Sequence, residues 1–431
     1  MAVSVVILAA GAGTRMKSAT PKVLHSLSGR PLIDYSVLAA KSISDDIQVI
    51  LYHEAERVEK HLNAVFPGLT LLRQDHLNFP GTGGAIKAAK PKYDQVAVLN
   101  GDMPLITPEF VQKLAASSAT VTLSTFEHPA PTGYGRVILD GDRVVAIVEE
   151  KDATEAQKRV QTVNAGVYAF NRAFLENALP RLSNQNAQKE YYITDLIGLA
   201  AAEGKSVAAV SGDQAMLMGV NSKAELAEAE TLHQRRLKTD WMKAGVIMRL
   251  PETIFIDSRA TFEGECELEP GVMIKGACKI VRSSVKAHSV IEDSVLIDSD
   301  AGPMARIRPQ SELIGTHIGN FVEVKKSKLT GVKAGHLSYL GDATIDEGTN
   351  VGAGTITCNY DGKGKHQTII GKNVFIGSDT QLVAPVNIPD NVLIAAGTTV
   401  TKNPQSGDLV LSRTPQKSVA GFFERFFGKK A

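Results

Sequence analysis

A glycine-containing loop near the N-terminus has the residue types of a phosphate-binding site. The segment LAAGAGTRM (Leu8–Met16) follows an apolar run, and Gly11 and Gly13 let backbone N–H groups approach phosphate oxygens without an obstructing Cβ. Arg15 and Lys22 add positive charge suited to a triphosphate. The third glycine of a dinucleotide-binding fingerprint is missing, as is the pattern GxxxxGK[ST]. The loop therefore predicts phosphate binding outside those two common classes.

A carboxylate follows a second apolar run. The segment LNGDMPL (Leu99–Leu105) places Asp102 at the end of a predicted strand, where its oxygens suit Mg²⁺ bound to phosphates. The segment GVNS (Gly219–Ser222) offers Asn221 as a second oxygen ligand. By itself, an aspartate after a strand is more often a turn cap than a metal ligand. The phosphate loop upstream favours the metal.

A third group of chemically capable residues lies in the C-terminal half. His336 stands in KAGHLSYLGD beside Tyr339, and histidine titrates near neutrality, as a base for acyl transfer to an amine requires. The glycine-flanked amide of Ala353 in GAGT could hold the resulting oxyanion. By its chemistry alone, His336 is more often a surface or turn histidine than a base. The same stretch carries three cations suited to a sugar phosphate: Arg308, Lys325 and Lys365.

Strands that alternate with helices must position the first two groups. The βαβ rhythm predicts a mostly parallel sheet covered by helices, and ligands of such sheets bind beyond the carboxyl ends of the strands. Both candidate loops, Gly11–Lys17 and Gly101–Leu105, directly follow predicted strands. The β-rich runs are Val3–Ala9, Gln48–Tyr52, Leu69–Leu72, Val96–Asn100 and Thr120–Thr125.

A different periodicity begins after a predicted helix over residues 221–244, for which Ser222 is a suitable N-cap and Gly245 a stop. Aliphatic residues then recur at every sixth position, which matches neither a helix nor an ordinary strand and is typical of hexapeptide coils. We therefore expect residues 1–221 to form an α/β nucleotide-binding domain, 222–245 a linking helix, and 246–431 a solenoid with a tail. The clearest series is Ile370, Ile376, Leu382, Ile388, Ile394 and Val400.

Composition limits the partners of the chain. Its 431 residues include 47 basic and 46 acidic ones, a net charge of +1 that gives no attraction along the whole surface for nucleic acid or an acidic membrane. The three scattered cysteines predict neither disulfides nor a zinc site, and no apolar run is long enough to span a bilayer. These features predict a cytoplasmic protein without a transmembrane segment.

The tail GFFERFFGKKA spaces its four phenylalanines on one face of a short helix. Two interpretations stay open. An amphipathic helix of this kind could touch a membrane surface, and packing against a neighbouring subunit is the more common use of such a face.

The combined motifs identify a family. The elements LxxGxGTRM and PK, Q-x(6)-GT and NGDxPL resemble the sugar nucleotidyltransferase superfamily. With GHLSYLGD, TITCNYDG and the hexapeptide repeats, the whole chain resembles the bifunctional N-acetylglucosamine-1-phosphate uridyltransferase/glucosamine-1-phosphate acetyltransferase family. The fold implied is a Rossmann-like α/β domain followed by a left-handed parallel β-helix. The implied product, UDP-N-acetylglucosamine, supplies peptidoglycan and lipopolysaccharide.

For uridylyl transfer, the resemblance implies UTP and Mg²⁺ as co-substrate and cofactor. It implies that Arg15 and Lys22 act on the phosphates and that Asp102 and Asn221 hold the metal. The chain departs from the family pattern in the uracil loop, where Gly84 replaces an expected histidine and two extra residues precede Gly81. The implied nucleotide site comprises Leu8, Ala9, Gly11, Gly13, Lys22, Gln74, Gly81 and Thr82, and the implied sugar-phosphate site comprises Gly135, Glu149, Asn164 and Asn221.

For acetyl transfer, the resemblance implies that His336 is the base and that acetyl-CoA is the donor. It also implies that acetylation comes first and that the protein is a homotrimer whose acetyltransferase sites are shared between subunits. Glu323 is a further candidate for orienting the amine. Glucosamine 1-phosphate is assigned to Arg308, Lys325, Tyr339, Asn350 and Lys365, and acetyl-CoA to Ala353, Asn359, Tyr360, Ser378, Ala396 and Arg413.

Two rival functions are weaker. A nucleotidyltransferase whose solenoid only oligomerises would give no reason for GHLSYLGD and CNYDGKGK. A non-catalytic scaffold would have no chemical need for Arg15, Lys22 and Asp102 together.

Overall fold

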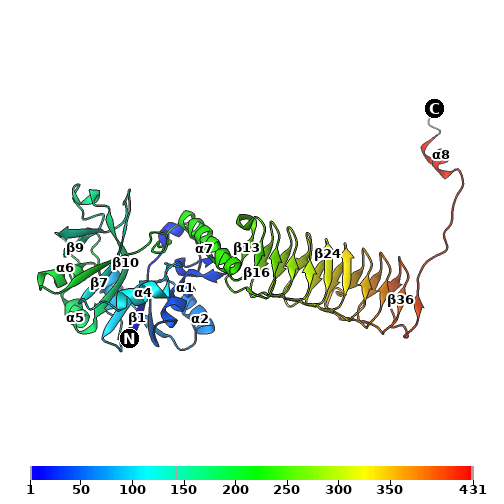
Figure 1. Cartoon of the computed structure of the whole chain (residues 1–431), viewed down its shortest axis with the longest axis horizontal. Coiled ribbons are helices and arrows are strands. Elements are labelled where there is room, and N and C mark those ends of the chain that lie inside the picture. Colours follow the sequence, from blue (N-terminus) through cyan, green and yellow to red (C-terminus); the bar gives the residue numbers. More distant parts are fainter. Residues whose placement is uncertain (1, 142, 429–431) are drawn as a thin grey trace. The chain divides into compact units, whose positions relative to one another are not determined.

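The computed structural model describes residues 2–141 and 143–428, which separate into two compact units, Met1–Gln234 and Arg235–Ala431. Figure 1 shows an α/β unit in blue to green and a stack of short strands in green to orange. Each unit has hydrophobic core residues of its own.

The central sheet of the first unit is mixed, and its main strand order is β11-β7-β10-β6-β1-β4-β5. Strand β1 is parallel to both of its neighbours, whereas β10 is antiparallel to β6 and to β7. The expectation of a mostly parallel sheet therefore holds only for part of it. The strands are β1 (Val3–Ala9), β4 (Asp46–Leu51), β5 (Thr70–Arg73), β6 (Gln95–Asn100), β7 (Val121–Glu127), β10 (Thr162–Asn171) and β11 (Val207–Ser211), with a hairpin of β8 (Arg136–Asp140) and β9 (Arg143–Val148) attached.

Alternate residues of β1 point into two different cores. Val5 and Ile7 pack with α1, α2 and α4 on one face, while Val6 packs with α3, α5 and α6 on the other. This explains the nearly continuous apolar sequence of β1, since a strand covered on both faces buries every side chain. The helices are α1 (Leu32–Lys41), α2 (Ala55–Val65), α3 (Thr82–Ile86), α4 (Pro108–Ala115), α5 (Arg172–Ala178) and α6 (Asp195–Ala202), and a small ribbon joins β2 (Ser26–Leu27) to β3 (Arg30–Pro31).

Helix α7 (Lys223–Lys243) confirms the predicted helix and its ends. The Ser222 hydroxyl accepts a hydrogen bond from the Glu225 N–H (3.2 Å), and Gly245 has a φ of 104°, which favours glycine. Near its C-terminal end, Leu237 and Trp241 pack against the core of the second unit, where Trp241 meets Phe262 edge to face. The first coils are therefore covered by helix α7.

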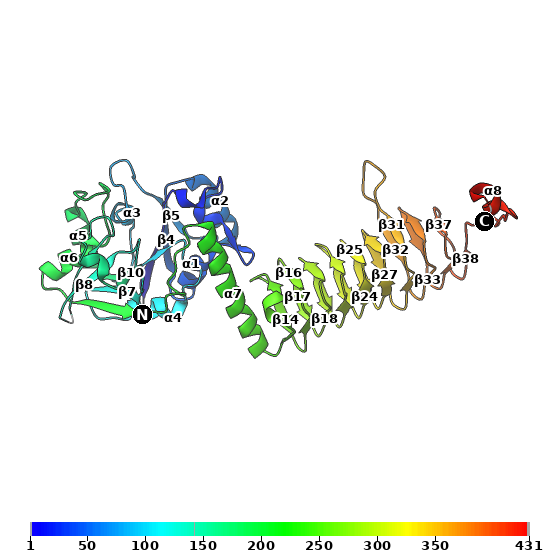
Figure 2. The same cartoon turned by 90° about the horizontal axis from the view of Figure 1, so that it is seen from above.

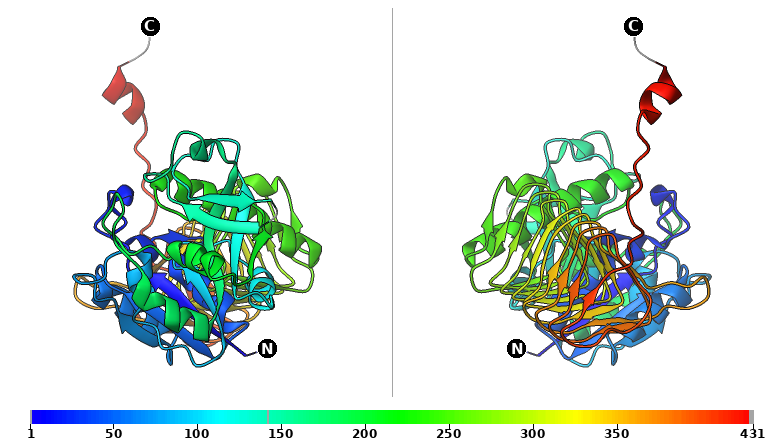
Figure 3. Two further views of the ribbon diagram at one scale, coloured as in Figure 1. Left: turned by 90° about the vertical axis from the view of Figure 1, so that its left-hand side faces the viewer. Right: turned by 90° about the vertical axis from the view of Figure 1, so that its right-hand side faces the viewer.

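The second unit is a left-handed β-helix of three parallel sheets. Each coil contributes one short strand to each sheet, which gives the stack a triangular outline when viewed along its axis (Figure 3). The predicted sixth-position residues face inward: Ile370, Ile376 and Leu382 are fully buried. Identical positions stack between coils, as Ile256 pairs with Ile274 and Ile274 with Ile291.

The three sheets have these strands. The first holds β12 (Ile247–Met248), β15 (Glu267–Leu268), β18 (Ser284–Val285), β21 (Asp300–Ala301), β24 (His317–Asn320), β27 (Lys333–His336), β30 (Asn350–Val351), β33 (Phe375–Ile376), β36 (Leu393–Ile394) and β38 (Leu409–Val410). The second holds β13 (Phe255–Ile256), β16 (Met273–Lys275), β19 (Val290–Glu292), β22 (Arg306–Ile307), β25 (Glu323–Lys325), β28 (Tyr339–Gly341), β31 (Ile356–Cys358), β34 (Gln381–Val383) and β37 (Thr399–Val400). The third holds β14 (Thr261–Glu263), β17 (Lys279–Val281), β20 (Val295–Ile297), β23 (Glu312–Ile314), β26 (Lys328–Thr330), β29 (Ala343–Ile345), β32 (Thr368–Ile370) and β35 (Val386–Ile388).

One loop leaves the stack between β31 and β32, as Figure 2 shows. It carries the polar segment CNYDGKGKH, and an isolated bridge between Tyr360 and Lys365 closes it. The chain ends in a short helix, α8 (Phe422–Phe427). None of the described helices is long and apolar enough to cross a membrane.

Candidate functional sites

The predicted phosphate loop and the predicted metal ligands meet at one edge of the first sheet. The Gly101 N–H donates to the Leu8 carbonyl (2.9 Å), which joins the loop after β6 to the end of β1. A Cβ added to Gly13 would lie 2.5 Å from the Lys22 Cβ, so this position requires glycine both for space and for its φ of 60°. The structure thus brings Leu8, Ala9, Gly13, Lys22 and Asp102 together.

The ammonium of Lys22 bridges the two predicted metal ligands. Its Nζ forms an ion pair with the Asp102 carboxylate and donates to the Asn221 Oδ1 at 3.0 Å. Two hard oxygen donors therefore already converge on one cation, which is the donor chemistry that Mg²⁺ prefers. Groups of three or more His, Cys, Asp or Glu side chains that could hold a metal are absent from the described residues. A divalent ion at Asp102 and Asn221 would have room for oxygens of a bound phosphate or of water in its coordination shell.

Arg15 is exposed on the one-turn helix after Gly13, and within the described residues it has no carboxylate partner. Gly11 is exposed, with open space where a Cβ would be. Both positions leave the loop free to meet a ligand.

The predicted uracil residues form a tightly bonded loop after β5. The Gln74 Nε2 donates to the carbonyls of Phe79 (2.8 Å) and Gly81 (3.0 Å), so both of its amide hydrogens are used. A Cβ on Gly84 would lie 1.9 Å from the Phe79 oxygen. The glycine that departs from the family pattern is therefore required by this longer loop. Thr82 joins the loop to the chain before α6, because its hydroxyl accepts from the Ile193 N–H at 3.1 Å.

Three of the four predicted sugar-phosphate residues of this unit are neighbours. The Asn164 N–H donates to the Gly135 carbonyl (2.9 Å), and a Cβ on Gly135 would lie 3.4 Å from a Glu149 carboxylate oxygen. Asn221, the fourth, lies with Lys22 and Asp102 instead. Burial raises the pKa of Glu149, while a hydrogen bond from the Thr194 hydroxyl (3.1 Å) opposes the shift.

Glu149→Gln should therefore stabilise the protein at neutral pH. A carboxyl whose pKa is raised by folding binds more protons in the folded protein than in the unfolded one. Glu149 therefore lowers the free energy of unfolding progressively as the pH rises above 4.5, the ordinary pKa of a glutamate. We expect a higher Tm for the variant at about pH 7.5, by about 2–4 °C for each kcal/mol relieved. The difference should vanish near pH 4. The exposed Glu176→Gln is the control, and a lower Tm of Glu149→Gln at neutral pH would contradict the argument.

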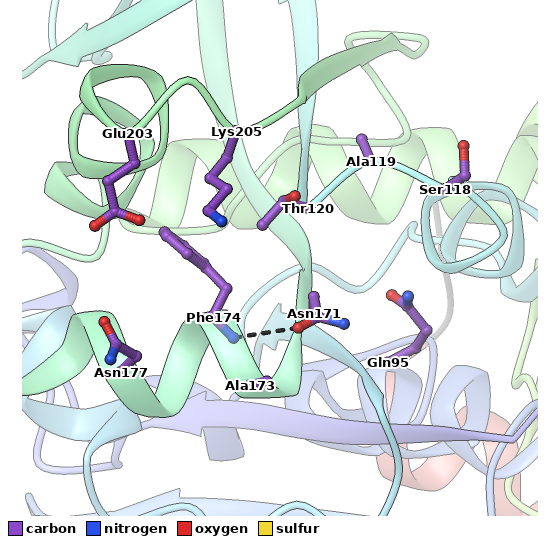
Figure 4. Close-up of a pocket in the computed structure, with 10 residues that line it drawn as sticks. All are labelled: Gln95, Ser118, Ala119, Thr120, Asn171, Ala173, Phe174, Asn177, Glu203 and Lys205. Atoms are coloured by element: carbon purple, nitrogen blue, oxygen red, sulfur yellow. Dashed lines mark hydrogen bonds between the residues drawn. The ribbon is translucent and has the colours of Figure 1, made fainter.

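An open pocket of about 460 Å³ lies elsewhere on the first unit (Figure 4). It is formed where β6 begins and β10 ends, at the opposite edge of the sheet from the phosphate loop, and it contains none of the predicted site residues. Its lining consists of Gln95, Ser118, Ala119, Thr120, Asn171, Ala173, Phe174, Asn177, Glu203 and Lys205.

Three basic residues of the β-helix, Arg308, Lys325 and Lys365, form what we call the cation face. Arg308 donates to a carboxylate oxygen of Glu323 at 2.8 Å. Ile307 pairs with Val324 on the neighbouring strand, so the residues that follow them, Arg308 and Lys325, lie side by side. Burial first, and then repulsion from Lys365, lower the pKa of Lys325. Lys365 also lies 5.2 Å from the centre of the Tyr360 ring. Clustered like charges of this kind suit an anion, and the cations are positioned by consecutive coils and the protruding loop.

Tyr339 and Asn359 border this face. The Asn359 Nδ2 donates to the Asp342 carboxylate and lies 3.4 Å from the Tyr339 hydroxyl oxygen. Asp342 was not among the predicted site residues, although it belongs to the quoted motif GHLSYLGD. The sequence does not show that the Asp342 carboxylate holds the Asn359 side-chain amide, because Asn359 lies one coil further along the β-helix.

The predicted acetyl-CoA residues Ala353, Ser378 and Ala396 stack along one corner of consecutive coils. The Asp379 N–H donates to the Ala353 carbonyl (2.7 Å), and the Gly397 N–H donates to the Ser378 carbonyl (2.8 Å). Within the described part of the chain, the N–H groups of these three stacked residues donate no hydrogen bond. The corner therefore offers a row of free donors about 4.8 Å apart.

His336 lies at the head of this corner. The following residue, Leu337, accepts from the Gly354 N–H at 3.0 Å, which places the histidine one coil before Ala353. The ring is exposed, and no described residue hydrogen-bonds to it. Within one chain, Asn350 lies on a different sheet from the cations, and Arg413 lies in the exposed segment after β38. The structure does not bring Asn350 to the cation face. Arg413 was predicted to contact acetyl-CoA, and the neighbouring Ser412 hydroxyl accepts from the Thr399 N–H (2.8 Å) on the coil of Ala396.

The fold defines a class: a nucleotidyltransferase domain joined to a hexapeptide β-helix. The family model described as a MobA-like NTP transferase domain matches residues 5–163. The family model described as a hexapeptide repeat of succinyl-transferase matches residues 367–402. Curated relatives named bifunctional protein GlmU match throughout. The relative from Sulfurovum sp. is 59% identical over 100% of both chains. The relative from Aliarcobacter butzleri is 57% identical over 99% of both chains, and that from Nitratiruptor sp. is 58% identical over 100% of both chains.

The chain therefore belongs to the GlmU family of bifunctional enzymes. Family membership confirms the predicted pairing of a glucosamine-1-phosphate acetyltransferase with an N-acetylglucosamine-1-phosphate uridyltransferase, and with it the synthesis of UDP-N-acetylglucosamine.

Proposed function

We propose that the edge of the first sheet is the uridyltransferase site. The observation that carries this proposal is the convergence of Lys22, Asp102 and Asn221 beside the phosphate loop. In this site the phosphate oxygen of N-acetylglucosamine 1-phosphate attacks the α-phosphorus of UTP, and pyrophosphate leaves. Lys22 and Arg15 stabilise the negative charge that develops on the phosphates. Mg²⁺, held by Asp102 and Asn221, supplies further charge neutralisation when it is bound.

We further propose that the corner and the cation face together form the acetyltransferase site. Arg308, Lys325 and Lys365 bind the phosphate of glucosamine 1-phosphate. The sugar amine attacks the thioester carbonyl of acetyl-CoA, His336 removes the proton from the nitrogen, and the thiol of CoA leaves. The free Ala353 N–H is positioned to hold the oxyanion.

A trimeric arrangement with shared sites is part of this proposal. Asn350 is separated from the cation face within one chain, so a second copy would have to supply it. The exposed His336 ring has no orienting partner among the described residues, which also supports an incomplete site in the single chain. We place the enzyme in the cytoplasm, where UTP and acetyl-CoA are available.

A coupled assay tests the two activities and their order. The purified protein receives glucosamine 1-phosphate, acetyl-CoA, UTP and Mg²⁺, and free thiol and pyrophosphate are followed separately. We expect both products, with pyrophosphate release dependent on prior acetylation. Pyrophosphate release with other sugar phosphates and without thiol release would mean that the β-helix is only structural.

Gly84→Ala should weaken the discrimination of UTP from CTP. Because both Gln74 amide hydrogens are bound by carbonyls, its Oε1 is left as an acceptor, which suits the N3–H of uracil and opposes the unprotonated N3 of cytosine. A Cβ at Gly84 would displace the Phe79 carbonyl and let the amide turn. We expect the ratio of kcat/KM for UTP over CTP to fall by about tenfold.

The matched control is Gly198→Ala, since a Cβ at Gly198 in α6 meets open space. It should leave the ratio unchanged. An unchanged ratio for Gly84→Ala in a folded protein would show that the loop does not set the orientation of the Gln74 amide.

A further inference from the structure

The C-terminal helix α8 presents four phenylalanines to solvent. Phe422, Phe423, Phe426 and Phe427 are 51%, 65%, 68% and 69% exposed. Their spacing places them on one face, and the rings of Phe422 and Phe426 stack at 5.7 Å while those of Phe423 and Phe427 lie 4.9 Å apart. Neither activity proposed above uses these side chains.

The sequence around this helix is rich in basic residues. Residues 414–431 contain four basic side chains and one acidic one, a net charge of +3. The whole chain carries +1, so the remaining 413 residues carry 1 − 3 = −2. Arg425 lies over the Phe422 ring at 5.3 Å, which places a cation directly beside the aromatic face.

We propose that residues 414–431 bind the surface of an anionic membrane, with the phenylalanines of α8 inserted among the lipid headgroups. Six helical residues are about 9 Å long, which is far too short to span a bilayer. An interfacial helix lies in the plane of the membrane, with its apolar face buried by about 5–10 Å. An apolar face bordered by basic residues is the pattern of interfacial helices, because the cations are attracted to anionic headgroups while the aromatic rings leave water.

A second copy of the chain is the competing partner. Phe375, Leu393 and Leu409 are 53%, 46% and 59% exposed and stack on adjacent strands, so they form an apolar ladder that a neighbouring tail could cover. Such a ladder would meet the aromatic face of α8. An anionic lipid surface would complement both the aromatic face and the charge of +3, and the observations favour it for that reason.

Vesicle flotation of the full-length protein tests the proposal. We expect at least about tenfold more protein bound to phosphatidylcholine vesicles with about 30% phosphatidylglycerol than to phosphatidylcholine alone. About 0.5 M salt should remove most of that difference. The double variant F423S/F427S should lose binding, and K417Q/R425Q should bind less and depend less on salt. The control Leu139→Ser removes an exposed apolar side chain outside the tail and should bind like the parent protein.

Thiol and pyrophosphate release by F423S/F427S should equal those of the parent, which shows that the variant is folded. Equal binding to neutral and anionic vesicles, or no binding to either, would overturn the proposal. A smaller oligomer for F423S/F427S in sedimentation velocity without lipid would also overturn it, since the tail would then cover a second copy.

Discussion

Acetyl transfer by the His336→Ala variant should fall by about 10²–10⁴-fold, while uridylyl transfer from supplied N-acetylglucosamine 1-phosphate stays near normal. A general base contributes rate increases of that size, and the exposed His336 ring beside the proposed acetyl-CoA corner is the group that we propose as the base. The loss should appear in kcat for thiol release. Uridylyl transfer in the same preparation shows that the protein remains folded.

The matched control is His317→Ala, another partly exposed histidine of the β-helix. Its ring hydrogen-bonds to Asp300 (2.8 Å) rather than facing the acetyl-CoA corner. This variant should keep both activities. If acetyl transfer by His336→Ala stays within about tenfold of the parent, His336 is not the base and another group must accept the proton.

The Asp102→Ala variant should show the reverse pattern, with pyrophosphate release lowered by about 10²–10³-fold and thiol release unchanged. The substitution removes one of the two oxygen donors that converge on a cation beside the phosphate loop, and it also leaves Lys22 without its ion-pair partner. Asp94→Ala is the control, because Asp94 precedes β6 at the opposite end of the strand and pairs with Arg172 on the surface.

Mixing the two variants provides a further check. Neither Asp102→Ala nor His336→Ala should make UDP-N-acetylglucosamine from glucosamine 1-phosphate, but together they should, since the acetylated sugar phosphate can diffuse from one protein to the other. Loss of both activities in either folded variant would contradict two separate sites.

The sequence predicted well those features that arise from local patterns. The strand runs, the ends of α7 and the sixth-position ladder all depend on residues close together in the chain, and the structure confirms them. It also placed both candidate loops at the carboxyl ends of predicted strands, and the structure shows that these strands, β1 and β6, are parallel neighbours.

Contacts between distant segments were harder to predict. The antiparallel direction of β10 depends on how the chain returns to the sheet after the β8–β9 hairpin, and no short motif encodes it. The ion pair of Lys22 with Asp102 joins residues 80 positions apart. The requirement for Gly84 follows from the path of Phe79, which is visible only once the loop has closed.

The two ends of the coil stack are unequal. Leu237 and Trp241 of α7 cover the first coils, whereas β38 pairs only with β36 and leaves Leu409 exposed. In a solenoid each repeat is stabilised by its neighbours, so opening begins at the less protected end and moves inward one coil at a time. Ala396 lies in these last coils. If Ala396 contacts acetyl-CoA as proposed, fraying of these coils would release the acetyl donor while the cation face and the whole first unit were still folded.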